Sequence, residues 1–191
     1  MSGQPAAGGP TSTFDAVILA GGRADRLGGA SKPDVVLEGR RLLDHTLAAT
    51  TEATRVVVVA PEEVSVPDGV RRTLESPRYG GPVAGLAAGL EALPPDADLV
   101  LVLACDVPRA APAVPRLVAA AESHDGAVLI DATGQPQWLT AVYRAGVLRR
   151  RLAVRTGGAL HALVAGLDLA EVPAQGREAE DVDTWDDVGS D

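Results

Sequence analysis

Apolar runs and amphipathic stretches alternate along most of this chain. Runs typical of strands buried on both faces cover Phe14–Ala20, Arg55–Ala60, Asp98–Cys105 and Gly126–Ile130, and a further short strand is expected over Val70–Glu75. Apolar residues recur at helical spacing between these strands, over Arg41–Ala53, Gly81–Leu93 and Ala111–Ser123. Strands that alternate with helices predict βαβ units and an α/β fold with a doubly wound, mostly parallel, Rossmann-like sheet.

The pattern loosens after Gln135. The stretch PQWLTAVY is followed by a short helix expected around Val147–Ala153 and by GGALHALVAGL. We expect this last third to add a small antiparallel edge and helices that shape the far side of a cleft. Right-handed crossovers place the strand-to-helix loops at one edge of such a sheet, where ligands bind.

Length and composition favour one soluble domain. The chain has 191 residues, of which 46% are hydrophobic, so a sizeable core is expected over residues 14–191. Residues 1–13 are small and polar, and we expect a disordered tail there. This segment has neither a basic region nor an apolar stretch, and no apolar run approaches the roughly 18–20 residues of a membrane span. A cytoplasmic protein is therefore expected.

Charge and cysteine content exclude several functions. With 17 basic and 26 acidic residues the net charge is −9, which argues against a general nucleic-acid or anionic membrane surface. A locally positive pocket for a small anion is compatible with that charge. Cys105 is the single cysteine, so an internal disulfide and a multi-cysteine metal site are excluded.

The loop after the first expected strand, Leu19–Lys32, reads LAGGRADRLGGASK. Gly21 and Gly22 allow backbone N–H groups to approach phosphate oxygens, and Arg26 and Lys32 supply positive charge. Lys32 is the only lysine of the chain, because the other basic residues are all arginine. The P-loop pattern is absent, since proline follows Lys32, and so is the GxGxxG dinucleotide fingerprint.

A carboxylate follows the most hydrophobic expected strand, in the sequence CDVP. Asp106 would lie at the ligand edge of the sheet, where a carboxylate can hold Mg²⁺ against a phosphate. The alternative is an aspartate that begins a loop or caps a helix. We expect Cys105 to be a small buried side chain rather than a nucleophile.

The spacing LAGG-xxx-R-L-G-xxx-K resembles the signature of the MobA-like nucleotidyltransferases. Enzymes of this family join an NTP to a phosphorylated acceptor and release pyrophosphate, on a fold of the nucleotide-diphospho-sugar transferase type. The resemblance is closest to the branch that transfers a guanylyl group from GTP to molybdopterin. It implies Mg²⁺ as cofactor and catalytic roles for Lys32, Arg26 and Asp106. It also implies nucleotide contacts from Leu19, Ala20, Gly21, Gly22 and Lys32.

Further segments extend the resemblance over Phe14 to Val188. ESPRYGGPVAGL is similar to an acidic residue followed by GPLAGL in the family, which implies nucleotide contacts from Glu75, with Ser76 as competitor, and from Gly81, beside Asp106. DVDTWDDV is similar to the closing motif of the family. It implies Asp183, or alternatively Asp181, as the second metal carboxylate beside Asp106, while a solvated cap is the alternative for this acidic stretch.

The acceptor side is less specific. PQWLTAVY resembles a family segment that lines the acceptor side, and Trp138 either packs on an acceptor ring or fills the core. Arg149–Arg151 and Arg155 fit an anionic acceptor or a solvated helix face. Val59 stands where the guanylyl branch typically has asparagine, so the base and the acceptor stay open.

The sequence thus predicts a Mg²⁺-dependent nucleotidyltransferase for GTP and molybdopterin. Within the same class, transfer from CTP or to another phosphorylated acceptor remains an alternative. A nucleotide-binding protein without catalysis, acting as a partner or chaperone, is an alternative from another class, and a plain NAD-binding domain is disfavoured by the missing fingerprint. Proteins of molybdoenzyme maturation are possible recipients of the product.

Overall fold

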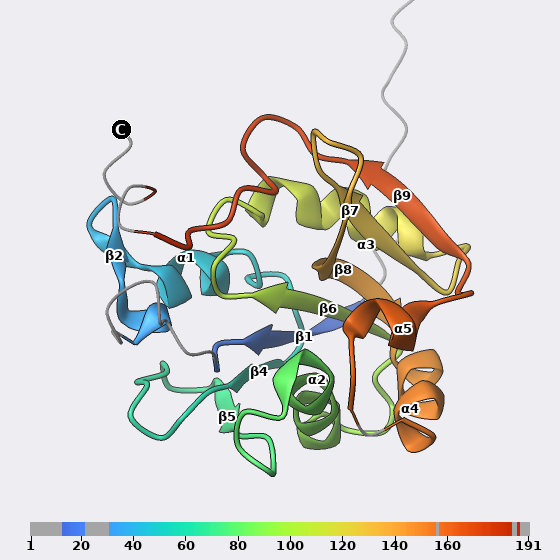
Figure 1. The fold of residues 1–191 in the computed structure, drawn as a ribbon, viewed down its shortest axis with the longest axis horizontal. Helices are drawn as coiled ribbons and strands as arrows, with labels where there is room; N and C mark the ends of the chain where they lie inside the picture. Colours follow the sequence, from blue (N-terminus) through green and yellow to red (C-terminus); the bar gives the residue numbers. More distant parts are fainter. Residues whose placement is uncertain (1–12, 22–30, 156, 185–186, 188–191) are drawn as a thin grey trace, which may run out of the picture.

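The computed structural model describes residues 13–21, 31–155, 157–184 and 187. A central sheet has the strand order β5-β4-β1-β6-β8-β7-β9 (Figure 1). Its strands are β1 (Phe14–Leu19), β4 (Val56–Val59), β5 (Arg71–Thr73), β6 (Leu99–Ala104), β7 (Gly126–Ile130), β8 (Pro136–Arg144) and β9 (Leu169–Pro173). A separate antiparallel pair consists of β2 (Val36–Leu37) and β3 (Arg40–Arg41).

Helices cover both faces of the central sheet (Figure 1). They are α1 (Leu42–Ala48), α2 (Gly81–Ala92), α3 (Val114–Ala121), α4 (Ala145–Ala153) and α5 (Leu160–Val164), with short 3₁₀ turns η2 (Lys32–Asp34) and η3 (Ala111–Ala113). Alternate residues of β1 point to opposite sides: Ile18 packs in a cluster with α1 and α3, whereas Val17 packs in one with α2, α4 and α5. This is the doubly wound arrangement that the apolar runs predict.

The α/β fold class is confirmed. Strand β1 pairs in parallel with β4 on one side and with β6 on the other, and β4 pairs in parallel with β5. Strand β7 pairs in parallel with β9. Strand β8 runs antiparallel to both β6 and β7. It lies inside the sheet between them, while β9 forms the edge. The antiparallel strand expected after Gln135 is thus β8, inside the sheet rather than at its edge, while β2 and β3 form a small separate antiparallel sheet.

Two elements differ from the sequence expectation. The helix expected over residues 41–53 ends at Ala48, because the Thr50 hydroxyl and N–H both bond to the carbonyl of Leu47 and turn the chain. Strand β9 was not expected, since its sequence LAEVP belongs to a stretch dominated by acidic residues. The expected tail, residues 1–13, lies outside the described residues except for Thr13.

Four parallel strands end at one edge of the sheet. Leu19 ends β1, Val59 ends β4, Glu75 follows β5 shortly after its end, and Cys105 follows β6. Parallel strands bring their carboxyl ends to the same edge, so these positions meet although they are far apart in sequence.

Among the described residues, none of the helices combines the length and the hydropathy that a membrane crossing demands.

Candidate active site

A cavity of about 350 Å³ opens at the carboxyl edge of β1, β4, β5 and β6. One part of its wall comes from the strand ends and the other from the loop before α2 and the first turns of α2. The lining residues are Leu19, Gly21, Lys32, Val59, Glu75, Tyr79, Gly81, Pro82, Gly85, Ala104, Cys105, Asp106 and Leu139. The loop edge predicted to bind a ligand thus carries a cavity.

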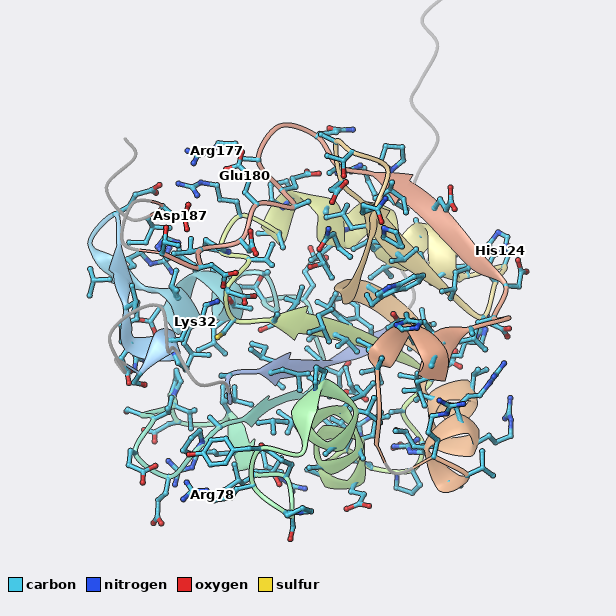
Figure 2. All side chains as sticks on the ribbon, viewed as in Figure 1. Lys32, Arg78, His124, Arg177, Glu180 and Asp187 are labelled. Carbon is cyan, nitrogen blue, oxygen red and sulfur yellow. The ribbon has the colours of Figure 1, made fainter. Side chains whose placement is uncertain are left out.

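Lys32 joins two carboxylates at one end of this cavity. Its Nζ donates a hydrogen bond to Oδ2 of Asp106, at 2.9 Å, and another to Oδ1 of Asp183. The lysine side chain is 14% exposed, whereas those of Asp106 and Asp183 are 28% and 41% exposed. The predicted catalytic lysine and both predicted metal ligands are therefore neighbours (Lys32 is labelled in Figure 2).

The electrostatics of this cluster favour a charged lysine. Burial opposes the charge on Lys32, but hydrogen bonds to Asp183 and Asp106 and the charges of both outweigh it, so the pKa of Lys32 is raised. Next to the cluster, burial and then the negative charge of Asp183 raise the pKa of the Asp181 carboxyl. Asp181 contributes no hydrogen bond to Lys32, so Asp183 is the residue of this motif that faces the lysine.

An apolar anchor brings Asp183 to the site. Val182, which is 1% exposed, packs in a small cluster with Val35, Leu37 and Leu42. Its N–H donates to the carbonyl of Asp106 at 2.8 Å. The same cluster lies directly after Lys32 in the chain, so burial of Val182 positions both sides of the lysine–aspartate contact.

The turn after Asp183 is held by a side chain. Oδ2 of Asp187 accepts hydrogen bonds from the N–H of Asp183 and from the N–H and hydroxyl of Thr184. These bonds lower the pKa of Asp187, those to Thr184 most. Figure 2 shows Asp187, Glu180 and Arg177 on the same side of the molecule as Lys32. These bonds tie Asp183, Thr184 and Asp187 together beside the lysine.

Glu75 lies at the other end of the cavity and is 7% exposed. Its Oε1 accepts a hydrogen bond from the N–H of Tyr79 at 3.1 Å. Among the described residues, its Oε2 is buried without a hydrogen-bond partner. A Cβ on Gly21 would lie 3.7 Å from this oxygen, so the glycine leaves the approach to the carboxylate open. A buried acceptor of this kind indicates a ligand that donates hydrogen bonds.

The start of α2 faces the same cavity. Gly81 has φ +80°, a conformation that favours glycine, and Pro82 follows in the first turn, where no helical donor is lost. The N–H groups in the first turn of a helix have no intrahelical acceptor, so this turn offers hydrogen-bond donors at the cavity. Gly81, predicted to contact a nucleotide, is thus in the cavity wall.

The remaining predicted residues divide into three groups. Leu19 lines the cavity, whereas Ala20 is buried in the core and donates its N–H to the carbonyl of Val59. Gly22 and Arg26 lie outside the described residues. Ser76, the alternative to Glu75, is exposed and lines a different groove beside α2.

Cys105 lines the cavity but is protected from ionisation. Burial, followed by the charge of Asp106, raises the pKa of its thiol to about 12. This agrees with a small buried side chain rather than a nucleophile, because the thiolate is the reactive form.

Two other features described from the sequence take structural roles. Trp138 is partly buried against the core cluster that contains α2 and α4. Arg149 donates hydrogen bonds to the carbonyls of Leu90, Pro94 and Pro95, and so caps the end of α2. Arg149 is therefore tied to the protein itself.

Sequence reasoning missed Tyr79, Val182 and Leu139 as parts of the site or its support. Leu139 belongs to the segment expected on the acceptor side, and its place in that segment was the signal available for it. Val182 sits between two aspartates, so a single apolar residue in an acidic stretch was its only signal. Tyr79 carried no signal, because its left-handed backbone conformation, with φ +63°, cannot be read from the local sequence.

The donor chemistry of the cluster suits Mg²⁺. Asp106 and Asp183 direct carboxylate oxygens at one cationic group, the lysine ammonium. Hard divalent cations accept one or two carboxylates and complete their shell with water and phosphate oxygens. No group of three or more His, Cys, Asp or Glu side chains that could hold a metal occurs within the described parts of the chain. A cation here would therefore need substrate oxygens.

Known proteins resemble this chain in sequence. The MobA-like NTP transferase domain matches residues 16–172. Proteins called molybdenum cofactor guanylyltransferase are similar: that of Shewanella baltica is 30% identical over 130 residues, covering 65% of this chain and 65% of that protein. That of Burkholderia vietnamiensis is 35% identical over 138 residues, covering 64% and 65%. The match thus spans slightly less than two thirds of these relatives.

Solved structures share the fold. Rv0371c of Mycobacterium tuberculosis superposes with a TM-score of 0.74 at 22% identity, covering 93% of this chain and 96% of that one. The molybdopterin-guanine dinucleotide biosynthesis protein A of Archaeoglobus fulgidus gives 0.69 at 20% identity, covering 92% and 95%. The 2-C-methyl-D-erythritol 4-phosphate cytidylyltransferase of Thermus thermophilus gives 0.71 at 22% identity, covering 93% and 96%.

Proposed function

Because the chain belongs to the MobA-like NTP transferase domain family, we propose that it transfers a guanylyl group from GTP to molybdopterin and releases pyrophosphate. The observation that carries the proposal is the convergence of Lys32, Asp106 and Asp183, of which Lys32 and Asp106 line the cavity. The similarity to proteins called molybdenum cofactor guanylyltransferase supports the choice of donor and acceptor.

In this reaction a phosphate oxygen of the acceptor attacks the α-phosphorus of GTP. The bond from that phosphorus to the oxygen bridging the α- and β-phosphates breaks, and pyrophosphate leaves with the bonding electrons. Such transfers depend on positioning and on stabilisation of negative charge. Lys32 supplies a fixed cation for the departing pyrophosphate.

We assign the divalent metal site of this reaction to Asp106 and Asp183. Mg²⁺ held there would offset negative charge on the α-phosphate. A structure of Rv0371c was obtained as a complex with manganese, which supports a divalent cation in this fold. Val182 and Asp187 keep Asp183 in place through the contacts described above.

A second candidate substrate is favoured by one observation. Val59 lines the cavity where the guanylyl branch typically has asparagine, so the polar contact of that side chain with the nucleotide is missing. Transfer from CTP, or to another phosphorylated acceptor, is the resulting alternative. The end of β4 is thus the position at which base selectivity has to be tested.

Pyrophosphate release tests the proposal. The purified protein is assayed with Mg²⁺ and each of the four NTPs, with and without molybdopterin. We expect release that requires both GTP and molybdopterin, and loss of release when EDTA removes the metal. Release with CTP in place of GTP would move the protein to the second candidate.

A substitution separates catalysis from binding alone. Asp106→Asn should lower turnover by about 100-fold or more, because it removes a charged metal ligand while keeping the side-chain shape. Asp96→Asn, which changes an exposed carboxylate before β6, is the matched control and should retain activity. Nucleotide binding without turnover in the unsubstituted protein would instead indicate a binding protein.

A further inference from the structure

Tyr79 combines an exposed side chain with a strained backbone. Its φ is +63°, in the left-handed region that bulky residues adopt only at an energetic cost. Tyr79 is 63% exposed, so the hydrophobic effect of burying its ring does not account for this cost. Glycine would adopt the same conformation without strain, and two glycines follow directly in the chain. Such strain at a cavity indicates a functional constraint on the residue.

The strained residue is held by a buried carboxylate. Oε1 of Glu75 accepts the N–H of Tyr79 at 3.1 Å, and Glu75 is 7% exposed. A hydrogen bond to a buried side-chain acceptor restrains the backbone group that donates it. The loop that carries Tyr79 is thus fixed at the cavity wall before any ligand binds.

The strand order places Tyr79 at the end of the cavity remote from Lys32. Glu75 follows β5, whereas Asp106 follows β6, and β4 and β1 lie between them. Three strand spacings of about 4.8 Å separate these ends by roughly 14 Å. Figure 2 shows Arg78, the residue before Tyr79, on the β5 side of the sheet and well apart from Lys32. A nucleotide whose phosphates contact Lys32 and which extends along this cavity would carry its base toward Tyr79.

The wall between these ends accepts a flat apolar group. Leu19, Val59, Pro82 and Gly85 line the cavity there. A Cβ on Gly85 would lie 3.3 Å from Cδ2 of Leu19, so the glycine permits close packing of α2 on the strand ends. This part of the wall is apolar, and among the described residues that line the cavity Tyr79 is the one with an aromatic side chain.

We propose that the ring of Tyr79 stacks on the base of the bound nucleotide and that its strained backbone serves to hold it there. The inference rests on the proposed function, because it requires a nucleotide in the cavity. Stacking on an aromatic ring tolerates every base, since each has a π-face. Tyr79 would thus add affinity for the nucleoside part of the substrate. Selectivity between bases would come from other groups, such as Oε2 of Glu75, which has no hydrogen-bond partner among the described residues.

The inference is tested by measuring the binding of two probes to three Tyr79 variants and to one control variant. GTP and inorganic tripolyphosphate, which lacks a base, are titrated with Mg²⁺ into the full-length protein by calorimetry. Tyr79→Asn keeps a residue that tolerates φ near +60°, and Tyr79→Gly relieves the strain entirely. Tyr79→Phe keeps the ring. Val154→Asn, at an 85% exposed position after α4, is the control for the replacement itself.

We expect Tyr79→Asn and Tyr79→Gly to weaken GTP binding by about 5- to 100-fold, with tripolyphosphate binding changed less than about twofold. Tyr79→Phe and Val154→Asn should bind both probes as the unsubstituted protein does. The melting temperature of Tyr79→Gly should not fall, because the strain is released, and this excludes unfolding as the cause of weaker binding.

Two outcomes would overturn the inference while leaving the proposed function intact. One is equal GTP binding by Tyr79→Asn and the unsubstituted protein. The other is an equal loss of GTP and tripolyphosphate binding, which would assign Tyr79 to the phosphate end. An unsubstituted protein that binds none of GTP, CTP, ATP and UTP would overturn the proposed function, and the inference with it.

Discussion

Lys32 is the one lysine in a chain whose other basic residues are arginine, and the structure gives a physical reason for its retention. Its Nζ fits between single oxygens of Asp106 and Asp183. An ammonium is a compact point charge that can do this, whereas a guanidinium is a broad planar fork with fixed donor directions. The space between the two carboxylates therefore selects lysine.

We predict that the substitution Lys32→Arg strongly lowers turnover. The charge is kept, but the planar group cannot take the position of Nζ, so turnover should fall by about 10-fold or more, and Lys32→Ala by about 100- to 1000-fold. The measurement is kcat/KM for pyrophosphate release. Arg40→Lys, on β3 outside the cavity, is the control. Full activity of Lys32→Arg would show that charge alone suffices at this position.

A second prediction concerns the thiol of Cys105. Because burial and the Asp106 charge raise its pKa to about 12, the native protein should react slowly with a maleimide or Ellman's reagent at pH 8, and the unfolded protein rapidly. The rate for the folded protein should continue to rise between pH 9 and 12.

The raised pKa of Cys105 also makes the stability of the protein depend on pH. The folded state keeps the thiol proton at pH values where the unfolded state has lost it, so this group lowers the free energy of unfolding as the pH rises from about 9 to 12. Cys105→Ala lacks this group, and its stability should decline less over that range. Rapid labelling of the native protein at pH 8 would contradict the assignment.

At the scale of elements, the packing of α2 on β1 depends on a glycine. A Cβ on Gly89 would lie 2.4 Å from Cγ1 of Val17 and 3.2 Å from Cγ2 of Val59, so the helix lies directly on the strands. Since the first turn of α2 lines the cavity, this close approach also fixes the cavity wall.

We predict opposite effects for two glycine-to-alanine changes in helices. Gly89→Ala should lower the free energy of unfolding by about 1–3 kcal/mol, because the new methyl group pushes α2 away from β1. Gly146→Ala, in α4, meets only Nη1 of Arg150 at 3.6 Å and should raise it by about 0.5–1 kcal/mol through helix propensity. Urea denaturation measures both. Equal effects would contradict the packing argument.

The elements also show where sequence reasoning succeeds. Apolar runs buried on both faces, such as Leu99–Ala104, identify their strands because a central parallel strand needs no polar alternation. Strand β9 could not be found in this way, because it lies at the edge of the sheet and contains Glu171 and Pro173. Strand β8 lies between β6 and β7 in the sheet. No local sequence pattern could predict this place, because it depends on which strands pair with one another.

In the candidate site, too, some residues could be identified from the sequence and others could not. Lys32 and Asp106 could be identified because each follows a recognisable strand or glycine loop. The contact of Asp183 with Lys32 follows from the burial of Val182 beside Val35 and Leu37, a long-range packing event. The family match ends at residue 172, so it does not cover this contact.

At the scale of the whole molecule, the segment after β9 is fastened in two places. Glu178, which is 5% exposed, accepts a hydrogen bond from Arg116 of α3 and another from the N–H of Gln175 at 2.7 Å. Val182 provides the second attachment through its apolar cluster. The acidic end of the chain is therefore folded onto the domain up to Asp183.

We predict that Val182→Ala lowers activity more than stability. Loss of two buried methyl groups should cost about 1–2 kcal/mol, which the domain tolerates, but Asp183 would no longer be held beside Lys32. Turnover should fall by about 10-fold or more at a temperature where the variant is folded, as judged by circular dichroism. Val36→Ala, at a 54% exposed position of β2, is the matched control. A loss of activity only where the protein unfolds would contradict this role.

The contact between Lys32 and Asp183 joins residues 151 positions apart. A ribosome that adds about 5–20 residues per second reaches Asp183 roughly 8–30 seconds after Lys32. During that interval a nascent chain holds Lys32 and Asp106 but not Asp183. The cluster of one lysine and two carboxylates is therefore completed only when the segment after β9 has been made.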